Sequence, residues 1–88
     1  MKYLVTAPVF VIAAMLSATV SAAPQCTNAP RSQWMTEEAM KQKVLDQGYT
    51  IKVFKVSGSC YEIYGKDKAG KKVEIYFDPT DGHNIKQR

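Results

Sequence analysis

The sequence predicts an α+β fold in which one N-terminal helix packs on a three- to four-stranded antiparallel β-meander. Residues 60–64 and 72–77 alternate apolar and polar side chains, which is the pattern of strands with one buried face. Residues 36–47 place apolar side chains at helical spacing, between a threonine and a glycine that suit the two ends of a helix. A chain of 88 residues has room for one domain.

The first residues have the pattern of a secretory signal. Lys2 supplies a positive charge, residues 4–16 are apolar apart from Thr6, and small residues follow at 20–23. We predict a signal peptide over residues 1–22, cleaved near Ala22, and hence a periplasmic or secreted protein that meets the membrane only through this leader. A membrane anchor is the alternative, but the apolar segment is shorter than the roughly 20 residues that a span needs.

Residues 23–33 are rich in Pro, Asn, Ser and Gln, and predict an irregular lead-in. The only two cysteines, Cys26 and Cys60, both follow the predicted cleavage site. Because an exported chain meets oxidising conditions, we expect a disulfide between them. A redox-active pair is the alternative, but the spacing is unlike Cys-x-x-Cys. Metal binding would need more ligands than these cysteines and His83 provide.

The predicted helix spans residues 36–47. Thr36 is the expected N-cap, acidic residues follow in the first turn, and Gly48 is the expected left-handed residue that ends the helix. Met40, Val44 and Leu45 form its narrow apolar face, which suits a helix lying on one face of a sheet.

The two alternating runs predict a hairpin with a defined register. If residues 67–70 form a type I turn with Gly70 left-handed, Asp67 lies opposite Lys71. One face then pairs apolar residues with apolar residues. The other face is expected to stay in water. The pairs are Ile63 with Ile75 and Tyr61 with Phe77 on the apolar face, and Glu62 with Tyr76 and Tyr64 with Glu74 on the wet face.

The flanking strands are less regular. Residues 49–56 change the phase of their alternation near Val53 and Phe54, which predicts a bulge there. Asp78, Pro79 and Gly82 predict a turn after the hairpin, with Pro79 fixing the backbone and Gly82 supplying a left-handed exit. A short last strand over residues 83–85 is expected to follow.

The chain is mildly basic, with a formal net charge of +4. Lysines crowd the tip of the hairpin at positions 66, 68, 71 and 72. A small cationic envelope protein that binds an anionic surface, whether lipid, lipopolysaccharide or nucleic acid, is therefore the alternative function. A solvated turn is the preferred explanation of these lysines, because no aromatic residues are interleaved with them and Asp67 partly offsets their charge. Nucleic acid is therefore not the expected partner.

Four segments together resemble a small exported PepSY-type domain: residues 34–39, the Gly48-Tyr49 pair, residues 60–64 and residues 73–82. The resemblance places this domain at residues 34–88. It departs from the usual pattern at His83, where the family usually has an acid. It implies a helix packed on an antiparallel sheet and a non-catalytic binding or regulatory module, sometimes one that restrains peptidases. Asp78, Pro79 and Gly82 match the family's motif as turn builders only.

We therefore expect that the protein is not an enzyme and that it has no catalytic, cofactor-binding or metal-binding residues. The expected partner is a protein or peptide of the envelope, such as a peptidase, bound by strand addition at an exposed sheet edge, either 49–56 or 83–85. Tyr64 and Tyr76 are candidate partner contacts on the wet face. The alternative is that both rings only shield the sheet backbone.

Overall fold

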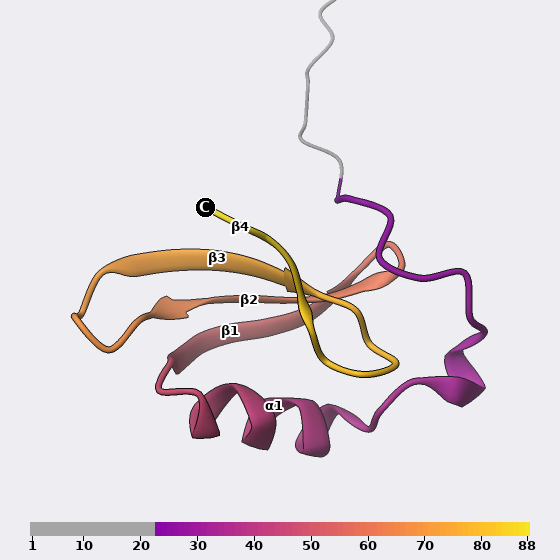
Figure 1. Ribbon diagram of the computed structural model, residues 1–88, viewed down its shortest axis with the longest axis horizontal. Helices are drawn as coiled ribbons and strands as arrows, with labels where there is room; N and C mark the ends of the chain where they lie inside the picture. Colours follow the sequence, from indigo (N-terminus) through magenta and orange to yellow (C-terminus); the bar gives the residue numbers. More distant parts are fainter. Residues whose placement is uncertain (1–22) are drawn as a thin grey trace, which may run out of the picture.

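The computed structural model describes residues 23–88, so the predicted signal peptide lies outside the described residues. The elements are a short 3-10 helix η1 (Arg31–Gln33), the helix α1 (Glu37–Asp46), and the strands β1 (Thr50–Ser57), β2 (Cys60–Lys66), β3 (Lys72–Phe77) and β4 (Asn84–Gln87). The strands form one antiparallel sheet in the order β1-β2-β3-β4, and α1 lies along one face of it (Figure 1). The predicted α+β class and its meander are confirmed. Neither helical segment of residues 23–88 has the length and apolarity needed to cross a membrane.

Helix α1 begins and ends as the sequence predicts. The Thr36 hydroxyl accepts a hydrogen bond from the Ala39 amide at 3.1 Å, which satisfies one of the free N–H groups of the first turn. Gly48 follows the helix with a φ of 98°, a conformation that costs glycine little. Met40 and Val44 are fully buried against the sheet. Leu45, which we expected on the same face, is exposed, so the buried stripe is narrower than predicted.

The central hairpin has the predicted register. Ile63 pairs with Ile75 and Tyr61 with Phe77, and the alternate pairs are Glu62 with Tyr76 and Tyr64 with Glu74. At the tip, the Asp67 amide donates to the Lys71 carbonyl at 2.9 Å, and Gly70 has a φ of 81°. Loop and alternation therefore select the same pairing.

Strand β1 contains the predicted bulge, which lies immediately before Val53 and so slightly earlier than expected. The register shifts between Ile51 and Val53. This shift turns Ile51, Phe54 and Val56 toward α1, where they pack against the main core, and leaves Val53 on the opposite face.

Strand β4 is longer than predicted. It runs over Asn84–Gln87 instead of ending at Ile85. Beyond its last residue, the Arg88 amide donates to the Glu74 carbonyl at 2.9 Å and the Arg88 carbonyl accepts from the Glu74 amide at 2.7 Å. This exchange carries the pairing with β3 to the C-terminal residue.

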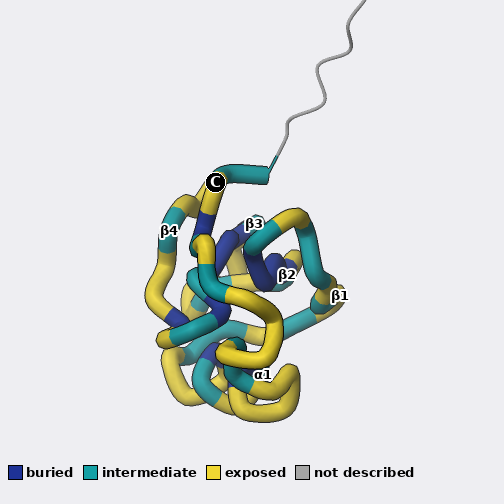
Figure 2. Tube along the Cα trace, turned by 90° about the vertical axis from the view of Figure 1, so that its right-hand side faces the viewer, coloured by how far each residue is buried: buried dark blue, intermediate teal, exposed yellow. Residues whose placement is uncertain are grey.

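The main core lies between α1 and the sheet. Its buried members come from the helix and from alternate positions of β2 and β3, and Figure 2 shows buried positions concentrated along these two strands. They are Met40, Val44, Tyr61, Ile63, Val73, Ile75 and Phe77.

The segment before α1 is tied to the same core. Trp34 packs edge-on against Tyr61, with ring centroids 5.3 Å apart, and its indole N–H donates to the Ala29 carbonyl at 3.1 Å. The Tyr61 hydroxyl donates to the Met35 carbonyl at 2.6 Å. Pro79, buried in the turn after β3, accepts the Met35 amide through its carbonyl at 2.8 Å. These contacts fix the start of the helix against the sheet.

A second, smaller core covers the other face of the sheet at one end. Cys26 and Cys60 form the predicted disulfide, with the sulfur atoms 2.03 Å apart. Both cysteines are buried together with Tyr76, and Ala23 and Ile85 pack against them. The Cys26 amide also donates to the Ser59 hydroxyl at 2.9 Å. The lead-in and β4 thus close part of a face that we expected to be in water.

Candidate functional site

We call the sheet surface opposite α1 the outer face. Strand alternation and pairing bring five side chains together on it from three strands: Lys55 from β1, Glu62 and Tyr64 from β2, and Glu74 and Tyr76 from β3. Arg88, at the end of the chain, joins them through the exchange with Glu74 described above. The second core covers one end of this face, and the hairpin tip forms the other.

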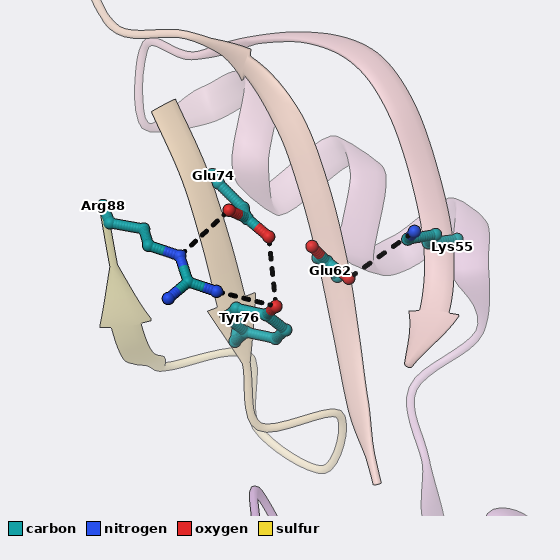
Figure 3. A network of polar contacts seen from close by, with 5 residues as sticks. All are labelled: Lys55, Glu62, Glu74, Tyr76 and Arg88. Atoms are coloured by element: carbon teal, nitrogen blue, oxygen red, sulfur yellow. Dashed lines mark hydrogen bonds and ion pairs between the residues drawn. The ribbon is translucent and has the colours of Figure 1, made fainter. Parts of the chain in front are cut away.

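Glu62 is the least expected member of this group, because its side chain is only 2% exposed. It lies between Lys55 on one side and the group of Glu74, Tyr76 and Arg88 on the other (Figure 3). One carboxylate oxygen, Oε1, lies 4.0 Å from the Lys55 Nζ atom. The other, Oε2, is buried and has no hydrogen-bond partner among residues 23–88. Burial raises the pKa of Glu62, and the neighbouring Glu74 carboxylate raises it further.

Glu74 has the opposite environment. Its Oε1 atom accepts from the Arg88 Nε–H at 3.0 Å, and its Oε2 atom accepts from the Tyr76 hydroxyl at 3.0 Å (Figure 3). The pKa of Glu74 is lowered to about 2. Interaction with the Glu62 carboxyl group is the largest cause, and the hydrogen bonds from Arg88 and Tyr76 lower the pKa further. The pair therefore keeps its last proton on Glu62.

The two tyrosines that we expected to contact a partner lie in different environments. Tyr76 is only 4% exposed, because the disulfide and Ile85 pack against it, so it does not offer its ring to a partner as we expected. Tyr64 is 38% exposed, and the Lys55 Nζ atom lies 5.3 Å from the centroid of its ring. The charge of Glu62, followed by partial burial, raises the pKa of Tyr64 to about 12.

A groove of about 580 Å³ lies next to Tyr64, at the end of the sheet nearest the hairpin tip. It crosses the first three strands and is lined by Thr50, Ile51, Lys52, Tyr64, Gly65, Lys66, Lys72 and Val73. Gly65 brings two of these strands unusually close, because a Cβ atom there would lie 1.8 Å from the Thr50 carbonyl oxygen. Three of the lining residues are lysines, and none is acidic.

Among residues 23–88, strand β1 forms one edge of the sheet and pairs only with β2. It has eight residues, whereas β4 at the opposite edge has four. Alternate backbone N–H and C=O groups of an edge strand point away from the sheet and can pair with another chain. Val53, which is 41% exposed, lies on this edge next to Tyr64. The edge, Val53, Tyr64 and the groove form one continuous surface, which is the candidate functional site.

The turn after β3 groups three potential ligand residues, but its own hydrogen bonds account for them. One potential ligand atom from each of three residues lies within 4.8 Å of the other two; the residues are Asp78, Asp81 and His83. The Asp78 carboxylate accepts from the Thr80 amide at 2.8 Å and from its hydroxyl at 2.6 Å. The Asp81 carboxylate accepts from the His83 amide at 3.0 Å, which is the main cause that lowers the pKa of Asp81. Gly82 supplies a φ of 80° for the exit of this turn.

The sequence did not predict the burial of Glu62 or the contribution of Lys52 to a groove, whereas Lys66 and Lys72 were identified as part of the basic hairpin tip. A signal for Glu62 was present, because strand alternation places Cys60 and Glu62 on the same face. A disulfide at Cys60 has to bring the lead-in across that face, and this covers the neighbouring side chains. No comparable signal existed for the groove, which depends on the position of the bulge and on the close approach of two strands at Gly65.

Comparison with known proteins identifies one matching family. The family model described as "Peptidase propeptide and YPEB domain" matches residues 6–88, which is most of the chain. No curated protein and no solved structure matches the chain. The match covers all four segments on which the resemblance to PepSY domains rests, namely residues 34–39, the Gly48-Tyr49 pair, residues 60–64 and residues 73–82. The chain therefore belongs to the PepSY family of peptidase propeptide and YPEB domains.

Proposed function

We propose that this protein is a non-catalytic binding module of the periplasm or the extracellular space, released by cleavage near Ala22. Its partner is an envelope protein, with a peptidase as the first candidate, and its effect on that peptidase is regulatory or inhibitory. Membership of a family described by peptidase propeptides supports this class of partner. The observation that carries the proposal is the free edge of β1.

Strand addition explains how such an edge would bind. An extended segment of the partner pairs with the outward-pointing backbone groups of β1, and these hydrogen bonds supply affinity without regard to sequence. Side chains of the added strand then alternate between the two sheet faces. On the outer face they meet Val53 and Tyr64, which are the exposed apolar and aromatic side chains beside this edge. The shorter β4 offers fewer backbone groups.

The acidic groups of the outer face support a binding role more than a catalytic one. A general acid or base has to reach its substrate directly or through one water molecule. Glu62 is buried below the surface, and Glu74 is engaged by Arg88 and Tyr76. Both carboxyl groups therefore act within the sheet.

Site-specific photo-crosslinking tests the proposal. A photoreactive amino acid is placed at Val53 on β1, and in a matched variant at Leu45 on α1, which is apolar and exposed to a similar extent at 48% against 41%. We expect Val53 to give covalent adducts with an envelope protein in cells and Leu45 to give none. The adduct is identified by mass spectrometry, and a peptidase found in it is assayed with and without the purified protein.

Hydrogen exchange provides the structural readout for the same complex. Addition of the crosslinked partner should slow exchange at alternate amides of Thr50–Ser57 and leave α1 unchanged. Adducts from Leu45 alone, or slowed exchange in β4 without a change in β1, would place the partner elsewhere and contradict the proposal.

The lysines of the hairpin tip favour a second candidate function, which is binding to an anionic surface. Lys66, Lys68, Lys71 and Lys72 are all exposed. Binding that depends on them would weaken steeply between low and moderate salt, whereas backbone pairing at β1 would persist. The salt dependence of binding therefore separates the two functions.

A further inference from the structure

We infer that the groove beside Tyr64 selects an acidic side chain on the extended segment that pairs with β1, so that the partner segment is an acidic peptide. This inference rests on the proposed function, because it assumes that the segment lies along β1. It adds the chemistry of the partner, which the pairing of backbone groups cannot specify.

Charge is the first argument. Lys52, Lys66 and Lys72 come from three neighbouring strands and line one groove. All three are exposed, and none takes part in an ion pair among residues 23–88. Elsewhere on the outer face, in contrast, Lys55 is matched by Glu62 and Arg88 by Glu74. No ion pair among residues 23–88 offsets the three groove lysines, which makes the groove complementary to a carboxylate.

Position is the second argument. The groove includes Thr50, Ile51 and Lys52, which are the first residues of the β1 edge. A strand added to this edge places every second side chain on the outer face, the side on which Tyr64 lies. A side chain of the added strand beside Thr50 therefore points toward the groove. An aspartate or glutamate there would reach the ammonium groups without leaving the register of the strand.

The wall of the groove is the third argument. The Tyr64 ring gives an apolar surface for the methylene groups of a glutamate. Gly65 lines the groove where β2 lies closest to β1. The groove thus combines an apolar wall with cations, which suits one acidic side chain.

The test uses a short synthetic peptide of alternating valine and glutamate, carrying a fluorescent label, and a matched peptide with glutamine in place of glutamate. Fluorescence anisotropy measures the binding of each peptide to the protein. The protein is expressed as the full chain and used in the processed form that the cell produces. The groove variant is Lys66→Gln with Lys72→Gln. The control variant is Lys68→Gln with Lys71→Gln, which removes the same charge from the same hairpin outside the groove. Circular dichroism confirms that both variants keep the wild-type fold.

We expect the glutamate peptide to bind more tightly than the glutamine peptide. The groove variant should weaken binding of the glutamate peptide by about threefold to tenfold, and the control variant by less than about twofold. Binding of the glutamine peptide should not change in either variant. This pattern would assign the acidic preference to the groove.

Three results would overturn the inference, and they can be distinguished from the result that would overturn the proposed function. Equal binding of the two peptides, with slowed exchange in β1, would leave strand addition standing and remove the acidic preference. An equal loss in the groove and control variants would show general attraction to the hairpin. Tighter binding to phosphatidylglycerol vesicles than to the peptide, lost in the groove variant, would assign the groove to lipid. If neither peptide nor the crosslinked partner slowed exchange in β1, the proposed function itself would fail.

Discussion

Glu62 and Glu74 are diagonal neighbours on β2 and β3, and their pKa values are shifted in opposite directions. Burial raises the pKa of Glu62, whereas the pKa of Glu74 is lowered to about 2, so Glu62 is the group that keeps its proton to higher pH. Interaction with the Glu62 carboxyl group is the largest cause of the low pKa of Glu74, and hydrogen bonds from Arg88 and Tyr76 lower it further. Each group makes the stability of the fold depend on pH, but with opposite sign.

For Glu62, we expect the free energy of unfolding to fall as the pH rises above the ordinary pKa of 4.5. The folded chain holds this proton to higher pH than the unfolded chain does, so deprotonation favours unfolding. The Glu62→Gln variant should lose this pH dependence, because its amide can donate toward Glu74 as the protonated acid does. At neutral pH it should be more stable than the wild type by on the order of 1 kcal/mol. Urea unfolding between about pH 4 and 7 measures the free energy of unfolding of the variant and of the wild type. The same pH dependence in both proteins would contradict the expectation.

Glu74 provides the matched control, with the opposite expectation. Its folded pKa of about 2 lies below its ordinary value of 4.5, so its stabilising effect is complete above 4.5 and is lost as the pH falls toward 2. Glu74→Gln should therefore destabilise the protein by on the order of 1 kcal/mol at neutral pH and have little effect near pH 2. A loss of stability that did not change with pH would instead indicate a packing defect.

Tyr64 should remain protonated at pH 10, where an ordinary tyrosine is half ionised, because its pKa is raised to about 12. The charge of Glu62 is the largest cause, so Glu62→Gln should move the ionisation of Tyr64 back toward 10. The phenolate absorbance measures this ionisation, and subtraction of the Tyr64→Phe spectrum assigns it. An identical titration of Tyr64 with and without Glu62 would contradict the assigned cause.

Removal of the disulfide should cost a large part of the stability of so small a domain. Cys26 and Cys60 are separated by 34 residues along the chain, and closing such a loop is worth about 4 kcal/mol in the chain-entropy model. We expect a lower thermal midpoint both for the reduced wild type and for the Cys26→Ala/Cys60→Ala variant. The variant also loses buried sulfur atoms, so agreement between the two samples would assign the effect to the bridge. Equal resistance to urea with and without the bridge would contradict its stabilising role.

Gly65 should not tolerate a methyl group, for a reason that does not apply to Gly70. A Cβ atom at Gly65 would lie 1.8 Å from the Thr50 carbonyl oxygen, so Gly65→Ala has to push β1 away from β2. We expect a loss of roughly 2 kcal/mol or more and faster amide exchange at the start of β1. Gly70→Ala meets nothing within 4 Å and costs only the backbone strain of a φ of 81°, about 1 kcal/mol. Equal effects of the two substitutions would show that β1 yields easily.

The parts of the fold that the sequence predicts well are those in which two local signals agree. The alternation around Ile63 and Ile75 and the turn at Gly70 each define the hairpin register, and they give the same pairing. The bulge was predicted from its effect on alternation, but Val53 is apolar and lies on the outer face, so the pattern alone placed the bulge too late.

The candidate site could be predicted only in part, because it depends on contacts between distant segments. Alternation correctly places Glu62 and Tyr76 opposite α1, but their burial arises from the lead-in and from Ile85. Tyr64 was identified as a partner contact, and its exposure fits that prediction without testing it. Lys66 and Lys72 face each other in the predicted hairpin register, whereas Lys52 joins them only through the pairing of β1 with β2.

Trp34 makes the layer that contains α1 observable without any label. It is the only tryptophan in the chain, and it packs against Tyr61 on the side of the sheet away from the disulfide. Its fluorescence emission should shift to longer wavelength when this layer becomes hydrated. If reduction of the disulfide left the emission unchanged while exchange near Cys60 increased, the two faces of the sheet would be shown to loosen independently.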